Sequence, residues 1–338
     1  MPSILEIEAT GPHALHRLEA SALTVHAQPV VVRGLCRDWP LVVTANRSAG
    51  DFARALAALD TGVAVDVLEL AAETDGVVGY NAAMDGFNYR HFKLPVREAL
   101  MGLAARNQRT PPVGVALQSA LIADCIPGFL QDHPMPCLPA SWAQPRLWLG
   151  NRVTTPAHFD ASHNLAVVAC GRRRFTLFPI EQIDNLYIGP LDFAPTLSAM
   201  TVARLNPPDL QRFPRLATAL RHAMTVELCP GDALYMPPLW WHQVESLEPL
   251  NALVNYWWTP PQAAAPAPMS GLGALSHAAL ALRQLPAAER AAWRVLFEHY
   301  VFADADPVAH LPLDRRGMLG TLEADALEQA RARIRRML

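Results

Sequence analysis

The sequence predicts a mainly β protein with flanking helices, folded as a closed barrel or as two facing sheets. The first observation is a succession of short segments between residues 146 and 258, rich in β-branched and aromatic residues and separated by turn residues. The second is the content of 30 prolines, which suits a protein with many loops between its strands. The third is a proline- and alanine-rich linker at 259–269, after which the pattern becomes helical.

Residues 1–145 are expected to supply strands and helices that cover the barrel. Apolar or alternating runs predict strands at 28–35, 63–70 and 113–119, and helical spacing predicts helices at 48–60 and 94–106. The segment 79–89 is aromatic and rich in turn residues. It is either a surface loop or the lining of a substrate groove, and the sequence leaves both open.

Residues 146–258 are expected to form the barrel itself. The predicted strands are 146–150, 154–159, 163–170, 173–178, about 199–203, 225–229, 233–236, 242–246 and 251–258, with helical interruptions at 180–187 and 209–223. Residues 270–338 predict three helices, at 272–285, 288–302 and 321–337. Their apolar stripe has to be buried, either on the barrel or against a second copy, and we expect a homodimer through these helices.

Composition excludes several classes of protein. No segment of the 338 residues approaches the unbroken apolar run of a membrane span, so no membrane partner is expected. A net charge of −3, with no basic run before the last few residues, speaks against nucleic-acid binding. The N-terminus lacks the basic and apolar regions of a signal peptide, and five cysteines without paired spacing favour reduced thiols. We therefore expect a cytoplasmic protein.

The candidate metal ligands are His158, Asp160 and His242, which we also expect to be the catalytic residues. Two imidazoles and one carboxylate are the ligand set that iron(II) oxygenases place on one face of the metal. On a strand, positions i and i+2 project to the same side, which would bring His158 and Asp160 together. A His-x-Asp triplet alone is a weak signal. Its context favours the metal interpretation, because β-rich residues 164–170 follow it and a turn with a short strand, 230–236, precedes His242.

Three successive arginines offer a cation for the barrel interior. If a 2-oxo acid chelates the metal, its far carboxylate needs a partner, and arginine presents a two-pronged donor to a carboxylate. Alternation places Arg173 on one face and Arg172 and Arg174 on the other, so we expect Arg173 to point inward. Asn164 and Asn255 lie inside apolar strands, where a buried amide needs a partner. A bound carboxylate and an ordinary hydrogen bond to the backbone explain them equally well.

These residues resemble the JmjC and cupin-like Fe(II)/2-oxoglutarate oxygenases, in particular the family's asparaginyl hydroxylases. The resemblance rests on residues 155–160, Asn164, residues 171–179, residues 230–242 and residues 255–257, and residues 29–35 look like the family's opening strand. It implies that residues 146–258 form a double-stranded β-helix, the jelly-roll or cupin barrel of JmjC type, followed by a C-terminal helical segment.

The resemblance also implies Fe(II), 2-oxoglutarate and O2 as cofactors and co-substrates. His158, Asp160 and His242 would hold the iron. Co-substrate contacts would come from Thr155, Asn164, Arg173 and Asn255, with Trp257 packed beside the site. Arg173 stands where the family usually has a lysine. Ala116 stands near the position of a tyrosine that helps to hold the same carboxylate, which leaves open whether this pair still accepts 2-oxoglutarate.

The functional hypothesis is an Fe(II)/2-oxoglutarate-dependent dioxygenase that hydroxylates a protein or peptide side chain, with succinate and CO2 as co-products. One alternative is a hydroxylase of a small-molecule metabolite. Another is a cupin that binds metal without catalysis.

Overall fold

The computed structural model describes residues 3–9, 20–110, 112–138, 141, 143–195, 198–259 and 270–336. The chain forms two compact units, residues 1–259 and residues 260–338, each of which is described by itself. Apart from Thr259, the predicted linker at 259–269 lies outside the described residues.

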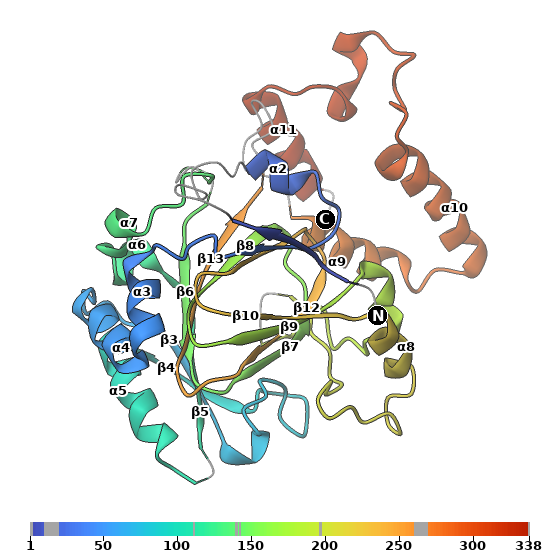
Figure 1. The fold of residues 1–338 in the computed structure, drawn as a ribbon. Helices are drawn as coiled ribbons and strands as arrows, with labels where there is room; N and C mark the ends of the chain where they lie inside the picture. The colour runs from blue at the N-terminus through green and yellow to red at the C-terminus, as the bar shows by residue number, and fades with distance from the viewer. Residues whose placement is uncertain are drawn as a thin grey trace. The chain divides into compact units, whose positions relative to one another are not determined.

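Two β-sheets face each other in the first unit (Figure 1). The small sheet has the order β10-β9-β12-β7. Its strands are β10 (Met224–Leu228), β9 (Arg173–Phe178), β12 (Trp241–Ser246) and β7 (Thr154–His158). The large sheet has the order β1-β2-β11-β8-β13-β6-β5-β3-β4. Its strands are β1 (Leu5–Glu8), β2 (Val30–Arg33), β11 (Ala233–Met236), β8 (His163–Cys170), β13 (Asn251–Trp258), β6 (Arg146–Gly150), β5 (Gly114–Leu121), β3 (Val65–Leu70) and β4 (Tyr89–Leu94). The predicted double-stranded β-helix is confirmed.

The alternation of β8 explains how the large sheet serves two cores. Ala166 and Val168 pack with Phe175 and Leu177 of β9, between the two sheets. The intervening residues of β8, Leu165, Val167 and Ala169, belong to the larger core on the opposite face. Because the strand is buried on both faces, its sequence is continuously apolar rather than alternating in polarity.

Helices cover the outer face of the large sheet (Figure 1). Phe52 and Leu56 of one of them, α4 (Ala49–Ala58), are fully buried in the larger core. Ser48 caps that helix by accepting from the backbone N–H groups of Gly50 and Asp51. The helices of the N-terminal part are α2 (Ala20–Thr24), α3 (Pro40–Arg47), α4 (Ala49–Ala58), η1 (Ala72–Thr74), α5 (Val96–Asn107), α6 (Ile122–Cys125) and α7 (Phe129–Asp132).

Some predicted elements differ in the structure. Residues 199–203 form isolated bridges at Met200 and Thr201 instead of a strand. The helix predicted at 209–223 is α8 (Leu216–His222) alone. Pro214 disfavours helical geometry at the residue before it, so the helix begins only after this proline. The interruption at 180–187 is the 3-10 helix η2 (Ile180–Asn185). Within the N-terminal region, β3, β4 and β5 extend the large sheet through the pairing of β5 with β6.

The second unit is helical and has little core of its own. It contains α9 (Gly271–Leu282), α10 (Ala287–Phe297), the π-helix η3 (Glu298–Phe302), the 3-10 helices η4 (Leu313–Arg315) and η5 (Gly317–Leu319), and α11 (Ala324–Arg335). Among its described residues only Val308 is a buried hydrophobic one, whereas Trp293 and Tyr300 remain 43% and 48% exposed. None of the helices in the described part of the chain is long and apolar enough to span a membrane.

Candidate metal centre and co-substrate cavity

The structure brings His158, Asp160 and His242 together between the two sheets. One ligand atom from each of the three lies within 4.8 Å of the others. His158 ends β7 and stands directly opposite His242 of β12 in the antiparallel pair. Asp160 lies two residues beyond the end of β7, in irregular backbone. The strand alternation expected to align it with His158 therefore does not extend to it, and other contacts hold the carboxylate.

Both imidazoles present their Nε2 atom to the site. The Nδ1–H of His158 donates to the carbonyl of Pro156 over 2.9 Å, and the Nδ1–H of His242 donates to the carbonyl of Trp240 over 2.9 Å. Nδ1 carries the proton in each neutral ring, so the lone pair of each Nε2 is free for a metal. The ring centroids are 4.3 Å apart. Burial, together with the neighbouring His242 ring, lowers the pKa of His158 to about 4, which keeps this ring neutral at pH 7.

Two hydrogen bonds fix the Asp160 carboxylate. Asn164 Nδ2 donates to Asp160 Oδ2 over 2.8 Å, and the indole Nε1–H of Trp257 donates to the same oxygen over 3.0 Å. His242 Nε2 lies 3.6 Å from this oxygen. Partners of this kind orient a ligating carboxylate before a metal binds.

A β-bulge brings Thr155 of β7 to the same face as His158. His242 pairs with His158 and Val244 pairs with Thr155, so two steps along β12 correspond to three along β7. The extra residue re-aims the side chains, and Thr155 and His158 both line the cavity although they are three positions apart. Pro156 is tolerated within the bulge because β7 is an edge strand.

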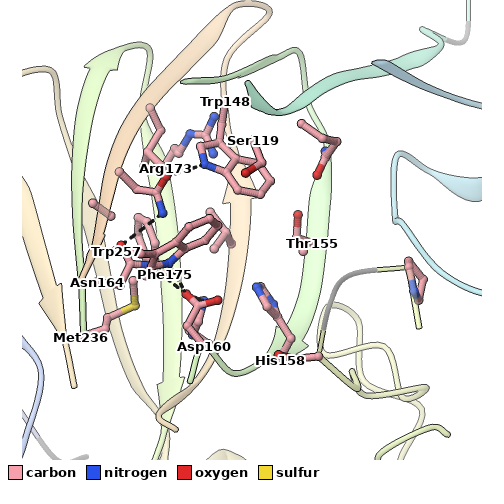
Figure 2. A pocket seen from close by; sticks show the side chains of 18 of the residues that line it. Ser119, Trp148, Thr155, His158, Asp160, Asn164, Arg173, Phe175, Met236 and Trp257 are labelled. Atoms are coloured by element: carbon pink, nitrogen blue, oxygen red, sulfur yellow. Dashed lines mark hydrogen bonds and ion pairs between the residues drawn. The ribbon is translucent and has the colours of Figure 1, made fainter. Parts of the chain in front are cut away.

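The cavity between the sheets has a volume of about 360 Å³. Figure 2 shows Arg173 and Ser119 toward one end and Asp160 and His158 toward the other. Apolar groups line much of the wall between them, including those of Ala166, Phe175, Met236, Val244 and Leu253.

Arg173 is the buried cation of this cavity. Its side chain enters from the first residue of β9, and the residue is 8% exposed. Its Nε makes no hydrogen bond to any residue that the structure describes, and burial lowers the pKa of the guanidinium to about 10. Arg172 and Arg174 lie on the outside, where they pair with Glu227 and Glu248. A buried guanidinium in this state fits an anionic ligand.

Ala116 belongs to a small apolar cluster with Leu70, Val78 and Val153 and does not line the cavity. A register shift in β5 between Leu117 and Ala120 instead presents Gln118 and Ser119 to it. Ser119 has a φ of 49°, an uncommon conformation for a residue other than glycine. Sequence reasoning missed both residues, because an alternating strand gives no sign of a bulge.

Asn164 and Asn255 form hydrogen bonds to side chains. The sequence had suggested either a bound carboxylate or the backbone as their partner. Trp148 Nε1 donates to Asn255 Oδ1 over 2.8 Å, and Asn255 Nδ2 donates to Asn164 Oδ1 over 3.4 Å. Both asparagines line the cavity. Trp148 is a further lining residue that the sequence did not single out, although its place between buried Leu147 and Leu149 puts it on the opposite face of β6.

Two nearby groups lie outside the cavity. His163 Nδ1 contacts the Tyr235 hydroxyl at 2.8 Å and its ring stacks on Trp258, so this histidine does not line the metal cavity. No residue of the segment 79–89 lines the cavity. Tyr80 and five other residues of that segment line a separate cavity on the outer side of the small sheet.

A double-stranded β-helix that gathers two imidazoles and a carboxylate beside a buried arginine defines a cupin with a candidate metal site and room for an anionic ligand. The cupin-like domain family matches residues 16–264, which is most of the chain. The chain belongs to this family, and the predicted resemblance is confirmed.

Several relatives carry JmjC names. The chain is 39% identical over 113 residues to human HSPB1-associated protein 1, a match covering 33% of this chain and 22% of that protein. It is 35% identical over 114 residues to Jumonji C domain-containing protein 5 of Drosophila melanogaster, covering 33% and 27%. It is 33% identical over 112 residues to lysine-specific demethylase JMJ31 of Arabidopsis thaliana, covering 33% and 20%. The match thus spans only about a quarter of these relatives' length. The JmjC and cupin family includes iron- and 2-oxoglutarate-dependent oxygenases and demethylases.

Proposed function

We propose that this protein is an Fe(II)/2-oxoglutarate-dependent oxygenase that hydroxylates a side chain of a protein or peptide. The observation that carries the proposal is the buried Arg173, whose Nε has no partner in the described residues, in the same cavity as His158, Asp160 and His242. Two imidazole nitrogens and a carboxylate suit iron(II), and a buried guanidinium suits the far carboxylate of a 2-oxo acid.

Each residue has a distinct task under this proposal. His158, Asp160 and His242 would hold the iron on one face, and Arg173 would bind the far carboxylate of the co-substrate. Thr155, Asn164 and Asn255 would contact the co-substrate, and Trp257 would orient Asp160. The bound iron would supply dioxygen activation, with succinate and CO2 as co-products. The apolar wall around Phe175 and Leu253 would exclude water from the oxidant.

The names of the relatives favour a protein substrate over a metabolite. One is named for association with a protein, and another is named a lysine-specific demethylase. Hydroxylation is favoured over demethylation here because the sequence resembles the asparaginyl hydroxylases.

Succinate formation tests the proposal. Purified protein with Fe(II), 2-oxoglutarate and ascorbate is incubated with a peptide mixture, and succinate and peptide mass are followed. The expected result is oxygen-dependent succinate formation with a gain of one oxygen atom in a peptide, both lost in Asp160→Ala. Iron binding without succinate formation under any of these conditions would favour a non-catalytic metal-binding cupin.

We also propose that the C-terminal helices pair with a second copy of the chain, in a cytoplasmic homodimer. Exposed apolar residues on α9, α10 and η3 support it, namely Leu275, Leu280, Trp293, Val295, Leu296, Tyr300, Val301 and Phe302. Light scattering on the full-length protein should give twice the mass of one chain, and a monomeric mass would contradict the pairing.

A further inference from the structure

A second cavity, of about 420 Å³, lies on the other side of the small sheet from the metal site. Strands β7 and β12 line both cavities. Thr155 and Val244 face the metal cavity, whereas Thr154 and Gln243 face the second one. Successive side chains of a strand point to opposite faces, so a single sheet layer separates the two cavities. The volume is within the range of ligand pockets, about 300–1,000 Å³.

Hydrogen bonds hold the walls of this cavity in place. Asn88 closes the segment that forms one wall, because its Oδ1 accepts from Gly79 N over 2.9 Å and its Nδ2 donates to Val77 O over 2.8 Å. The opposite wall, residues 201–206, is joined to β7 through Thr201 N, which donates to Ala157 O over 2.8 Å. The Tyr80 hydroxyl donates to Phe193 O over 2.7 Å. The cavity is therefore a defined site.

Two amides in the lining have polar atoms without a hydrogen-bond partner among the described residues. Gln243 is 4% exposed, lines the cavity, and has no side-chain hydrogen bond among the residues that the structure describes. A primary amide offers two donors and one acceptor oxygen, and leaving them unpaired in a buried place is unfavourable. Asn81 also lines the cavity, but its Nδ2 donates to Asp85 Oδ1 over 2.8 Å and its unpaired Oδ1 is buried. The Gln243 amide is therefore the group that points to a polar ligand.

The charged groups of the lining indicate which ligand. Glu245, whose side chain is 13% exposed, pairs through Oε1 with Asn206 Nδ2 at 3.3 Å and Arg174 Nη1 at 3.7 Å, whereas its Oε2 has no partner among the described residues. Arg212 lies over the Phe213 ring, 5.0 Å from its centroid, and forms no ion pair with any described carboxylate. The third charged residue, Arg204, is already engaged by Asp75 and by the Thr74 carbonyl. One carboxylate oxygen of Glu245 and the guanidinium of Arg212 therefore remain for a ligand.

We propose that this cavity binds a small zwitterion, either a free α-amino acid or a dipeptide. Its ammonium group pairs with Glu245 and its carboxylate with Arg212. Gln243 bonds to the remaining polar groups. The site is distinct from the metal cavity and does not depend on the oxygenase activity.

The test is calorimetric titration of the metal-free full-length protein with free L-amino acids and with dipeptides. We expect at least one of them to bind, and Gln243→Leu to weaken its affinity at least tenfold. Gln243→Leu removes an unpartnered amide and should fold, and Arg212→Met at the exposed side is a second variant with the same expected loss. The Asp160→Ala variant of the metal cavity should bind as the wild type does.

Matched ligands distinguish a free amino acid from a dipeptide and test whether both the ammonium and the carboxylate of the ligand are needed for binding. If a free amino acid is the ligand, its N-acetyl and its amide derivatives should both bind more weakly. If a peptide is the ligand, the dipeptide should bind more tightly than either of its amino acids. The proposal is overturned if no zwitterion binds, if derivatives lacking one charge bind equally well, if both Gln243→Leu and Arg212→Met retain full affinity, or if Asp160→Ala abolishes binding.

Discussion

Trp257 and Asn164 stand opposite each other in the pairing of β13 with β8, and both donate to Asp160 Oδ2. The large sheet thereby orients the carboxylate, while the small sheet carries both histidines. The ligand set is complete only when the two sheets face each other, so formation of the metal site is coupled to folding of the barrel.

Trp257→Phe keeps an aromatic ring but removes the indole donor to Asp160. We expect metal affinity to fall by about 10- to 100-fold, because a partner that orients a ligating group contributes that much. Cobalt(II) titration of the purified variant, followed by absorbance, measures the change.

Trp258→Phe is the matched control, since the neighbouring indole packs on His163 and Tyr235. It should leave cobalt affinity at the wild-type value. Equal affinities in Trp257→Phe and the wild type would mean that the hydrogen bond to Asp160 does not set the ligand's position.

Trp148→Phe tests whether Trp148 helps to orient Asp160 through the two asparagines between them. An indole N–H can only donate and an ionised carboxylate can only accept, so Trp148 at one end and Asp160 at the other impose the same orientation on both asparagine amides between them. Without the indole donor the amides are free to flip, and we expect a several-fold loss of cobalt affinity. Trp240→Phe removes an indole donor to the Ala27 carbonyl, and neither Trp240 nor Ala27 lines the cavity, so this variant should show no loss. An unchanged affinity in Trp148→Phe would refute the orienting role.

Much of the fold was predictable because the β-rich segments between residues 146 and 258 are short, apolar and separated by turn residues. Eight of the nine strands predicted there are present. The remaining one, at 199–203, forms only isolated bridges, because its residues pair singly with β7 and with Ile188. Strand periodicity cannot distinguish a ladder from isolated bridges.

His158 should titrate far below an ordinary histidine. Its pKa of about 4 lies below the usual 6.5, so the ring stays neutral while the pH falls through that range. The unfolded chain takes up a proton there and the folded protein does not, so the free energy of unfolding of the metal-free protein should decrease as the pH falls from 6.5 toward 4. Nitrogen-15 NMR of the imidazoles, assigned through His158→Gln, measures this pKa. A midpoint near 6.5 would contradict the burial argument.

Arg173→Met should affect stability and ligand binding in opposite directions. It replaces a desolvated guanidinium with an apolar side chain of similar length, so the free energy of unfolding of the metal-free protein should rise by about 1 kcal/mol or more. Binding of 2-oxoglutarate should be weakened. Urea denaturation and calorimetry measure the two effects. Arg172→Met, on the outer face of the same hairpin, should change neither appreciably, and a loss of stability in Arg173→Met would show that the guanidinium has a structural partner.

The candidate site was predictable in its residue types but not in its geometry. Alternation along β9 indicated that Arg173 and not its neighbours points inward, and the structure has it so. The bulge in β7 that aligns Thr155 with His158, and the one in β5 that presents Ser119, depend on pairing with distant strands. Local sequence carries no sign of either.

The most direct test of the central claim is an anaerobic titration of the metal-free protein with Fe(II) and then 2-oxoglutarate, followed by visible absorbance. We predict a charge-transfer band of the chelated oxo acid in the wild type, absent in Asp160→Ala and weakened in Arg173→Ala. Stoichiometric iron binding without this band would contradict the account. It would mean that the cavity around Arg173 does not accept 2-oxoglutarate.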